Sequence, residues 1–249
     1  MSFENTYLIL GASSDLGVEL IRSLNSEKSN SLFLAHYNSS KSKFDEIPMQ
    51  NGNVIEPIQC DLSNPDSVDE FIAQIQEKTD APTHIVQLAA DSFKYMRLKE
   101  FSREALLKSI DIQVCSFAAI LKKFLPVMAK RKAHNKVVIM LTSYILDTPP
   151  KFVLEYMIAK SALLGLMRSV ATDYVGKFVN VNALSPSMIE TKFLKNIDER
   201  IVQMTAEKSP EERNATPADI VPVIKFLLSD SANYIHGANL NVCNGGQFN

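Results

Sequence analysis

Short apolar segments alternate with longer amphipathic ones from one end of the chain to the other. The apolar segments are rich in β-branched residues, and they are apolar throughout rather than at every second position. This pattern is typical of strands buried on both faces of a parallel sheet. Seven such strands are expected, at residues 6–10, 31–36, 53–59, 84–90, 136–142, 178–184 and 239–243.

The amphipathic segments have the periodicity of helices with one apolar face. The last of them starts with Thr216 as a suitable N-cap and Pro217 at the first helical position. Regular alternation of strand and helix predicts an α/β fold, with a doubly wound, seven-stranded parallel sheet and helices on both faces. Helices are expected over residues 15–26, 65–78, 102–130, 152–174 and 217–229.

The chain shows no linker, repeat or low-complexity tract, so residues 1–249 are expected to form one domain. The connection at 188–210 has no clear strand. A long connection of this kind is often a lid over a site, and we expect a substrate lid there.

Composition excludes several classes of function. The chain has 249 residues, 46% hydrophobic and 22% charged, with a net charge of −2, so no basic field indicates a nucleic-acid partner. No apolar run approaches the ~20 residues of a membrane span, and the first residues do not resemble a signal peptide. The four histidines show no metal-binding spacing. Cys60, Cys115 and Cys243 are far apart, which favours reduced thiols in a cytoplasmic protein.

A small-residue turn follows the first strand and leads directly into a helix. Gly11 permits the tight turn, Ser13 and Ser14 add hydroxyl groups, and Gly17 lets the helix pack close to the strand. Asp15 stands where a glycine is usual and is also a good N-cap. Strand, turn and helix in this order present backbone N–H groups to a phosphate, although an ordinary capped turn has the same pattern.

Other chemistry-bearing residues are expected at the same edge of the sheet. Asp61 follows the third strand, and the small residues Ala89 and Ala90 follow the fourth. Ligands of open α/β sheets bind outside the carboxyl ends of the strands, so these residues are candidates for the wall of a ligand site.

A tyrosine precedes a lysine by four residues at three places in the chain. These pairs are Tyr37–Lys41, Tyr95–Lys99 and Tyr156–Lys160, and the spacing alone does not choose among them. Only Tyr156 lies early in a long helical segment with a hydroxyl residue, Ser143, thirteen positions earlier at the end of the fifth strand. Tyr156–Lys160 is therefore the catalytic candidate.

Together these motifs resemble the short-chain dehydrogenase/reductase family over essentially the whole chain. The family's TGxxxGxG loop is similar to residues 10–17, and its Ser, Tyr and Lys triad to Ser143, Tyr156 and Lys160. Three further elements match in order, the NNAG motif at 87–90, the N-x3-P-G-x3-T element at 182–191 and the C-terminal TPxEIA…VDGG element at 216–246.

The resemblance implies a single-domain Rossmann fold and hydride transfer between a nicotinamide and a carbonyl or secondary alcohol carbon. Tyr156 would be the general acid/base, with a pKa lowered by Lys160, and Ser143 would hydrogen-bond the reacting oxygen. Lys160 would also reach the cofactor ribose. The cofactor-binding residues implied are Gly11, Ser13, Ser14, Asp15, Leu16, His36, Asp61, Leu62, Ala89, Ala90, Tyr156, Lys160, Pro186, Ile189 and Thr191.

The chain departs from the family pattern at several positions. Gln113 stands at the fourth catalytic position, which is an asparagine in the family, and this puts the usual proton relay in doubt. Gln87 and Leu88 replace the two asparagines of NNAG, Ala90 replaces its glycine, and Ser187 replaces the glycine after Pro186. An active enzyme is expected, and the alternative is a cofactor-binding regulatory or structural protein with little turnover.

The end of the second strand bears on the choice of cofactor. NAD-specific members carry a carboxylate there, whereas His36 holds this position here. Ser39, His36 and Lys41 are candidates to bind a 2′-phosphate, so NADP(H) is favoured and NAD(H) is the alternative.

The pattern is nearest to 3-oxoacyl-carrier-protein reductases, which implies a small carbonyl or alcohol substrate, free or bound to a carrier protein. Sugars, steroids and polyols stay open as substrates. The basic run Lys130–Lys132 with Lys136 is either a docking site for an acidic carrier or a solvated helix end. The family's tetramers imply a homo-oligomer, tetramer or dimer, with Leu163, Leu164, Leu166, Met167 and Val170 as candidates for core or interface. Expected substrate-side residues are Tyr144, Ile145, Leu146, Met188, Phe193 and Leu194.

Overall fold

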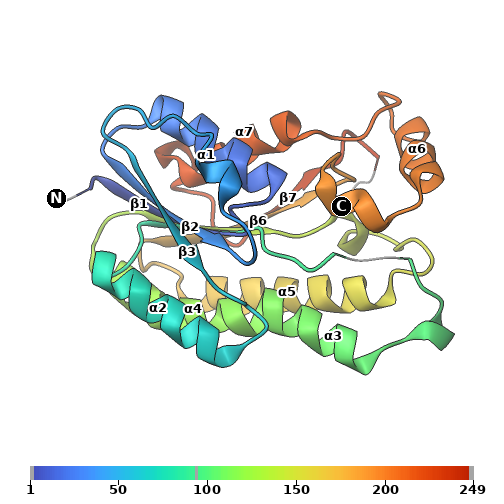
Figure 1. The fold of residues 1–249 in the computed structure, drawn as a ribbon, viewed down its shortest axis with the longest axis horizontal. Coiled ribbons are helices and arrows are strands. Elements are labelled where there is room, and N and C mark those ends of the chain that lie inside the picture. Colours follow the sequence, from blue (N-terminus) through green and yellow to red (C-terminus); the bar gives the residue numbers. More distant parts are fainter. Residues whose placement is uncertain (1–2, 93–94, 247–249) are drawn as a thin grey trace.

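The chain folds around one parallel sheet in a computed structural model that describes residues 3–92 and 95–246 (Figure 1). The strand order is β3-β2-β1-β4-β5-β6-β7, and every neighbouring pair is parallel. The direction of winding reverses between β1 and β4, which is where sheets of this kind bind ligands. The strands are β1 (Asn5–Leu10), β2 (Ser31–Tyr37), β3 (Val54–Gln59), β4 (His84–Gln87), β5 (Asn135–Met140), β6 (Val179–Pro186) and β7 (Asn239–Val242).

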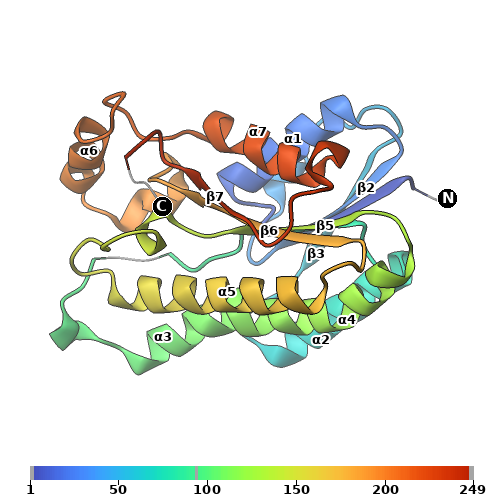
Figure 2. The ribbon, with the colours of Figure 1, turned by 180° about the vertical axis from the view of Figure 1, so that it is seen from behind.

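Helices cover both faces of the sheet, as the two opposite views show (Figures 1 and 2). On one face, α1 and α7 pack beside each other, and on the other lie α2, α4 and α5 with α3 at their end. The remaining helix, α6, lies beyond the carboxyl ends of the strands (Figure 1). The helices are α1 (Asp15–Glu27), α2 (Pro65–Lys78), α3 (Arg103–Ile110), α4 (Ser116–Lys130), α5 (Leu154–Asp173), α6 (Glu199–Glu207) and α7 (Pro217–Leu228).

Two apolar cores, one on each face of the sheet, hold these layers together. Leu8 and Leu10 of β1 point into one core, while Tyr7 and Ile9 point into the other. Side chains alternate between the faces of a strand, so a strand covered on both sides must be apolar at successive positions. This confirms the α/β fold, the seven parallel strands and the helices on both faces.

The expected helix boundaries agree closely with the structure, and Thr216 and Pro217 begin α7 in a capping box with Asp219. The expected helix at 102–130 forms as one run, but its interior holds a feature that was not expected. A π-helical turn, Asp111–Cys115, joins α3 to α4, and Gln113 lies in it. Turns of this kind occur often at functional sites.

By length and composition alone, the run Arg103–Lys130 is apolar enough to cross a membrane, contrary to the expectation from the sequence. Several apolar side chains of its α4 part, including Phe117, Ile120 and Phe124, are fully buried in the core beneath the sheet. Burial in that core accounts for its apolar composition, so the run is weak evidence for a span.

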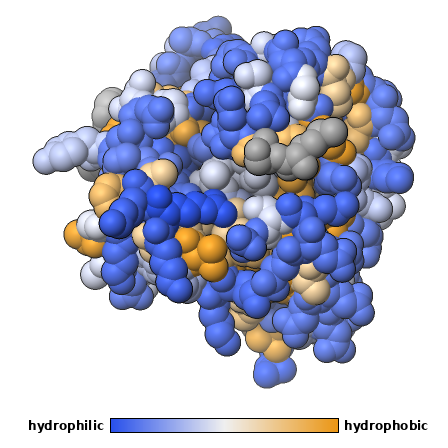
Figure 3. All heavy atoms as spheres, turned by 90° about the vertical axis from the view of Figure 1, so that its left-hand side faces the viewer, coloured by the Kyte–Doolittle hydropathy of each residue, from blue (hydrophilic) through white to orange (hydrophobic). Residues whose placement is uncertain are grey.

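The amino ends of the strands form the edge that faces the viewer in Figure 3, a surface that is mainly hydrophilic. The basic run lies at this edge, at the end of α4 and the start of β5. Arg131 donates to the carbonyl of Pro82 at 2.8 Å, and buried Lys136 donates to Asn180 Oδ1 at 3.1 Å. Two of the four cations therefore hold the fold together, and the run lies opposite the edge described next.

Candidate functional site

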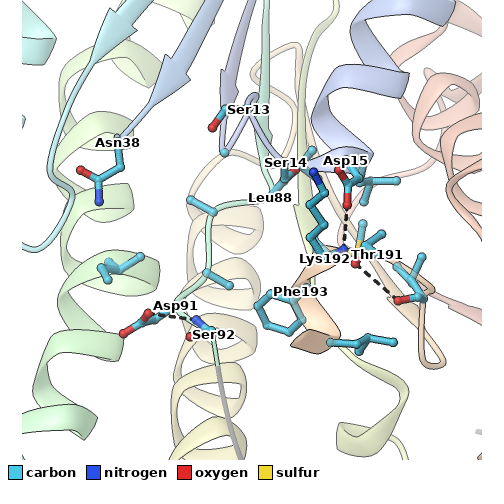
Figure 4. Close-up of a pocket in the computed structure, with 18 of the residues that line it drawn as sticks. Ser13, Ser14, Asp15, Asn38, Leu88, Asp91, Ser92, Thr191, Lys192 and Phe193 are labelled. Carbon is cyan, nitrogen blue, oxygen red and sulfur yellow. Dashed lines mark hydrogen bonds between the residues drawn. The ribbon is translucent and has the colours of Figure 1, made fainter. Parts of the chain in front are cut away.

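A cleft of about 640 Å³ lies at the carboxyl ends of the strands. Its wall is formed by the turn after β1, the ends of β2 and β3, the loop after β4, the start of α5 and the segment after β6 (Figure 4). All the cofactor-binding residues implied by the family resemblance line this cleft. The topology explains the gathering, since parallel strands bring their carboxyl ends to one edge.

The turn after β1 has the tight packing that its glycines predict. Gly11 has φ +78°, and a Cβ there would lie 2.8 Å from Ala89 N. A Cβ on Gly17 would lie 2.7 Å from Ala12 Cα. Ser14 is the N-cap of α1, because its Oγ accepts from Gly17 N at 3.0 Å. The expectation that Asp15 caps this helix is therefore wrong, and Asp15 is its first residue.

His36 supports the same turn from β2. Its Nδ1 accepts a hydrogen bond from Gly11 N at 2.9 Å, so Nε2 carries the proton and faces the carbonyl of Cys60 at 3.1 Å. Burial lowers the pKa of His36 to about 4, against the effect of the Cys60 carbonyl. A neutral imidazole with both nitrogens engaged cannot supply a charge to a 2′-phosphate, which corrects the role expected for His36.

The lysine after β2 that lines the cleft also differs from the expected one. Lys41 is exposed and does not line the cleft, whereas Lys43 does, together with Asn38 and Ser39. The backbone turns through a short 3₁₀ helix, Ser42–Phe44, which directs positions 41 and 43 differently. A sequence signal was present, because Lys43 lies only two residues beyond Lys41.

Asp61 and the loop after β4 form the next part of the wall. Asp61 Oδ1 accepts from the Ser63 hydroxyl at 2.7 Å and from Ser63 N at 2.9 Å, and these two bonds hold the pKa of Asp61 below its ordinary value. Beyond β4, Gln87 Oε1 accepts from Ala89 N at 3.1 Å. The glutamine that replaces an asparagine of the family motif thus fixes the turn that presents Ala89 and Ala90 to the cleft.

Tyr156 and Lys160 lie one turn apart on α5, and both line the cleft. Lys160 is 3% exposed, its Nζ donates to the carbonyl of Met140 at 2.9 Å, and it lies 5.9 Å from the centre of the Tyr156 ring. Burial raises the pKa of Tyr156 to about 12 and lowers the pKa of Lys160 to about 7.

Both shifts have the same cause, because burial disfavours whichever form is charged. The family resemblance predicts a lowered pKa for Tyr156, whereas burial raises it in the structure. A hydrogen bond from Thr142 to Tyr156 acts in the expected direction but is smaller than the effect of burial. Tyr156 is thus neutral at neutral pH and able to donate a proton.

The hydroxyl group beside Tyr156 belongs to Thr142. Thr142 lines the cleft, while Ser143 is 3% exposed, starts the 3₁₀ turn Ser143–Ile145 and does not line it. Sequence spacing singled out Ser143, and Thr142 was missed, although the two are neighbours. The spacing fixes a distance along the chain, whereas the 3₁₀ turn that begins after Thr142 sets the direction of each side chain.

Gln113 lies behind the cleft. It is 1% exposed, and its Nε2 donates to Ser109 Oγ at 2.9 Å. Its Oε1 is buried without a hydrogen-bond partner among the described residues, and its backbone carbonyl accepts from Gln87 Nε2 at 3.2 Å. A relay through the amide nitrogen of Gln113 would therefore have to displace its bond to Ser109, whereas Oε1 makes no bond within the described residues that would have to be displaced.

The segment after β6 closes the remaining side of the cleft. Of the residues expected on the substrate side, Tyr144, Met188, Phe193 and Leu194 line the cleft, whereas Ile145 and Leu146 do not. Phe193 points into the cavity (Figure 4). Lys192 and Lys195 also line it and were not singled out in the sequence. The segment holds the 3₁₀ helix Lys192–Asn196 and then α6.

The candidates for a subunit interface on α5 face mainly inward. Leu163 and Met167 are fully buried, and Leu164, Leu166 and Val170 pack against the same core. Across residues 3–92 and 95–246, no group of three or more histidine, cysteine or acidic side chains is placed to hold a metal ion.

Comparison with known proteins identifies the family. A family model described as enoyl-(acyl carrier protein) reductase matches residues 11–247, nearly the whole chain. The chain belongs to the short-chain dehydrogenase/reductase family. Among curated relatives, the uncharacterized oxidoreductase YmfI of Bacillus subtilis is 25% identical over 245 residues, covering 97% of this chain and 98% of its own.

Other members of the family carry more specific names. The 3-oxoacyl-[acyl-carrier-protein] reductase MabA of Mycobacterium tuberculosis is 28% identical over 191 residues, 76% of this chain and 75% of its own. A 3-ketoacyl-(acyl-carrier-protein) reductase of Brucella melitensis, solved with NADH, superposes with a TM-score of 0.84 at 17% identity and covers 99% of both chains. A putative NAD(P)-dependent gluconate 5-dehydrogenase of Beutenbergia cavernae, solved with NADP, gives 0.86 at 23% identity over 98% of this chain and 97% of its own. The two solved structures confirm the fold.

Proposed function

We propose that this short-chain dehydrogenase/reductase is a nicotinamide-dependent ketoreductase that interconverts a ketone and a secondary alcohol, with Tyr156 as general acid/base. One observation carries the proposal. Tyr156 and Lys160 line the same cleft as the phosphate-binding turn Gly11–Gly17. The names of the acyl-carrier-protein reductases among the relatives support a 3-oxoacyl substrate, free or on a carrier.

The residues of the cleft fit a dinucleotide cofactor. Its volume of about 640 Å³ lies within the range of roughly 300–1,000 Å³ that is usual for ligand sites. The turn at Gly11 packs so tightly against the loop after β4 that a Cβ would collide there, and α1 presents its N-terminus beside it. Lys43, Lys108, Lys192 and Lys195 line the cleft and suit an anionic ligand.

In this proposal Ser13, Ser14 and Thr191 hold the diphosphate, Asp61 and Leu62 the adenine side, and Pro186 and Ile189 the nicotinamide side. The bound nicotinamide supplies the hydride. Tyr156 donates its proton to the alkoxide that develops on the substrate, a role suited to a phenol that burial keeps neutral. Thr142 hydrogen-bonds the phenol of Tyr156, and Lys160, which donates to the carbonyl of Met140, lies 5.9 Å from the centre of the Tyr156 ring. The contribution of Ser143 and that of Gln113 remain predictions from the resemblance.

NADP(H) is the proposed cofactor, with NAD(H) as the alternative. No carboxylate ends β2, where Asn38 and Ser39 line the cleft with Lys43. An ammonium group with neutral hydroxyl and amide groups favours a 2′-phosphate over a free ribose hydroxyl. A higher kcat/KM with NADPH than with NADH is expected, and a clear preference for NADH would contradict this choice.

The reaction is tested by titrating the protein with NADPH and then adding ketones. The panel contains 3-oxoacyl thioesters on carrier protein and on a small thiol, together with sugar, steroid and polyol ketones. Binding followed by oxidation of NADPH with a 3-oxoacyl thioester is the expected result. Tight binding without oxidation across the whole panel would contradict the proposal and favour a cofactor-binding regulatory protein.

A further inference from the structure

The carboxylate of Asp15 joins three segments that are far apart in the sequence. Its Oδ1 accepts a hydrogen bond from Lys43 Nζ at 2.7 Å, and its Oδ2 accepts one from the backbone N–H of Lys192 at 2.7 Å. Lys43 lies between β2 and β3, and Lys192 follows β6. Figure 4 shows the bond from Lys192 to Asp15 at the side of the cavity.

Asp15 has no capping role that would explain this carboxylate, because Ser14 caps α1. Both of its oxygens are directed to distant partners instead. Burial acts to raise the pKa of Asp15, but the bonds from Lys192 and Lys43 outweigh it and hold the pKa below its ordinary value. The carboxylate is charged at neutral pH, and charge-assisted bonds of this length are stronger than neutral ones.

The short helix Lys192–Asn196, within the expected lid, is also held at its other end. Asn196 Nδ2 donates to Ser92 Oγ at 3.2 Å, in the loop after β4. The short helix Lys192–Asn196 therefore spans from the phosphate-binding turn to the loop after β4. Phe193 and Leu194, which lie between these two ties, line the cleft. The tie at Asp15 is the stronger one, since the contact at Ser92 joins two uncharged groups.

We propose that Asp15 is a positioning residue that latches the lid onto the phosphate-binding turn and thereby slows the release of the dinucleotide cofactor. The family motif has a glycine at this position, which could form neither bond. Lys43, Lys192 and Lys195 all line the cleft, so one carboxylate among them leaves the region positive and able to accept an anionic diphosphate. The proposal rests on the proposed function for the identity of the ligand, whereas the latch itself is a property of the protein alone.

The substitution Asp15→Asn tests the latch. It keeps the shape of the side chain but removes the charge and one of the two acceptors. Hydrogen exchange at the Lys192 amide is expected to accelerate about tenfold or more, as for the loss of a charge-assisted bond. The release rate and the KM of NADPH are expected to rise about tenfold, proportionally more than any change in kcat. A Lys192 amide as protected as in the wild type, with an unchanged NADPH release rate, would overturn the proposal.

Lys43→Met serves as a second variant, because it removes one partner and keeps the bond to Lys192. Because Lys43 is also the proposed contact of the 2′-phosphate, this variant is compared by hydrogen exchange at the Lys192 amide, which is expected to accelerate less than in Asp15→Asn. Lys41→Met is the matched control, since Lys41 is exposed in the same loop and outside the cleft, and it is expected to match the wild type. Exchange of the Lys192 amide as fast in Lys43→Met as in Asp15→Asn would contradict the latch. If the wild type binds no dinucleotide, the proposed function fails, while the exchange of the Lys192 amide still decides whether the latch exists.

Discussion

At the scale of single residues, the chemistry depends on how deeply Tyr156 and Lys160 are buried. The sequence places them one helical turn apart, and that arrangement alone favours a phenolate beside an ammonium group. The structure adds a dry environment in which both groups are favoured in their neutral forms. Burial thus decides the direction of both pKa shifts, and no spacing along the chain reveals burial.

Lys160→Met gives a test of this burial that does not depend on catalysis. The pKa of Lys160 is about 7 in the folded protein and 10.5 ordinarily, so the unfolded chain holds more protons between these two values. Burial of Lys160 therefore lowers the unfolding free energy of the wild type most below about pH 7. This loss of stability disappears as the pH rises to about 10.

Unfolding free energies of Lys160→Met and the wild type, measured at several pH values, check this expectation. The unfolding free energy of the variant minus that of the wild type should be larger at pH 6 than at about pH 10, because methionine has no proton to lose. The lost bond to the Met140 carbonyl lowers the stability of the variant equally at every pH. If the difference in unfolding free energy between the two proteins does not change with pH, the lowered pKa of Lys160 is contradicted.

Two residues show where prediction from the sequence stopped. The thirteen-residue spacing selected Ser143, yet its neighbour Thr142 faces Tyr156 in the cleft. The end of the second strand selected Lys41, yet Lys43 lines the wall. In both cases a neighbouring residue lines the cleft in place of the one selected, because a 3₁₀ turn sets the direction of each side chain, while the role of Ser143 stays a prediction.

At the scale of the elements, the phosphate-binding turn depends on close packing between α1 and the loop after β4. Gly17 is a helical residue without a Cβ, and a Cβ there would lie 2.6 Å from the carbonyl oxygen of Ala12. Gly17→Ala is expected to destabilise the protein by about 1–3 kcal/mol, as overpacking does, and to weaken NADPH binding by distorting the turn.

Gly165→Ala is the matched control for that substitution. Gly165 is exposed on α5, and nothing lies within 4 Å of the position of its Cβ. Alanine is favoured over glycine in a helix by about 1 kcal/mol, so this variant is expected to be more stable than the wild type. Thermal unfolding and NADPH titration of both variants check the pair. Equal unfolding temperatures and equal NADPH affinities of the two variants would show that the packing at Gly17 is not tight.

Two helical elements of the structure were not expected from the sequence. The sequence indicated a lid over 188–210 but gave no helix there, whereas the structure has α6 within that segment. No residue of α6 is fully buried, yet its nine residues are clearly amphipathic, so a sequence signal for this helix was present and was not used. The π turn at Gln113 was missed for a different reason, because one added residue per turn hardly changes the apolar pattern of a long helix.

At the scale of the whole molecule, the fold was predictable because two faces of a parallel sheet must both be covered. That requirement makes β1, β2 and β5 apolar at successive positions, places helices between the strands and brings seven carboxyl ends to one edge. The same geometry separates the cleft from the basic run at the other edge, whose Arg131 and Lys136 have structural partners. The oligomeric state and the substrate depend on side chains that the burial pattern of the sheet does not determine, so both remain predictions.

The central claim is that Tyr156 is the proton donor in carbonyl reduction, and Tyr156→Phe tests it most directly. Single-turnover reduction of a 3-oxoacyl thioester is measured at saturating NADPH, with Tyr37→Phe as the control. Tyr37 belongs to another Tyr–Lys pair with the same spacing and does not line the cleft. The rate of Tyr156→Phe is predicted to fall by roughly 100- to 10,000-fold, the usual contribution of a general acid, while Tyr37→Phe keeps the wild-type rate. A rate for Tyr156→Phe equal to that of Tyr37→Phe would contradict the account.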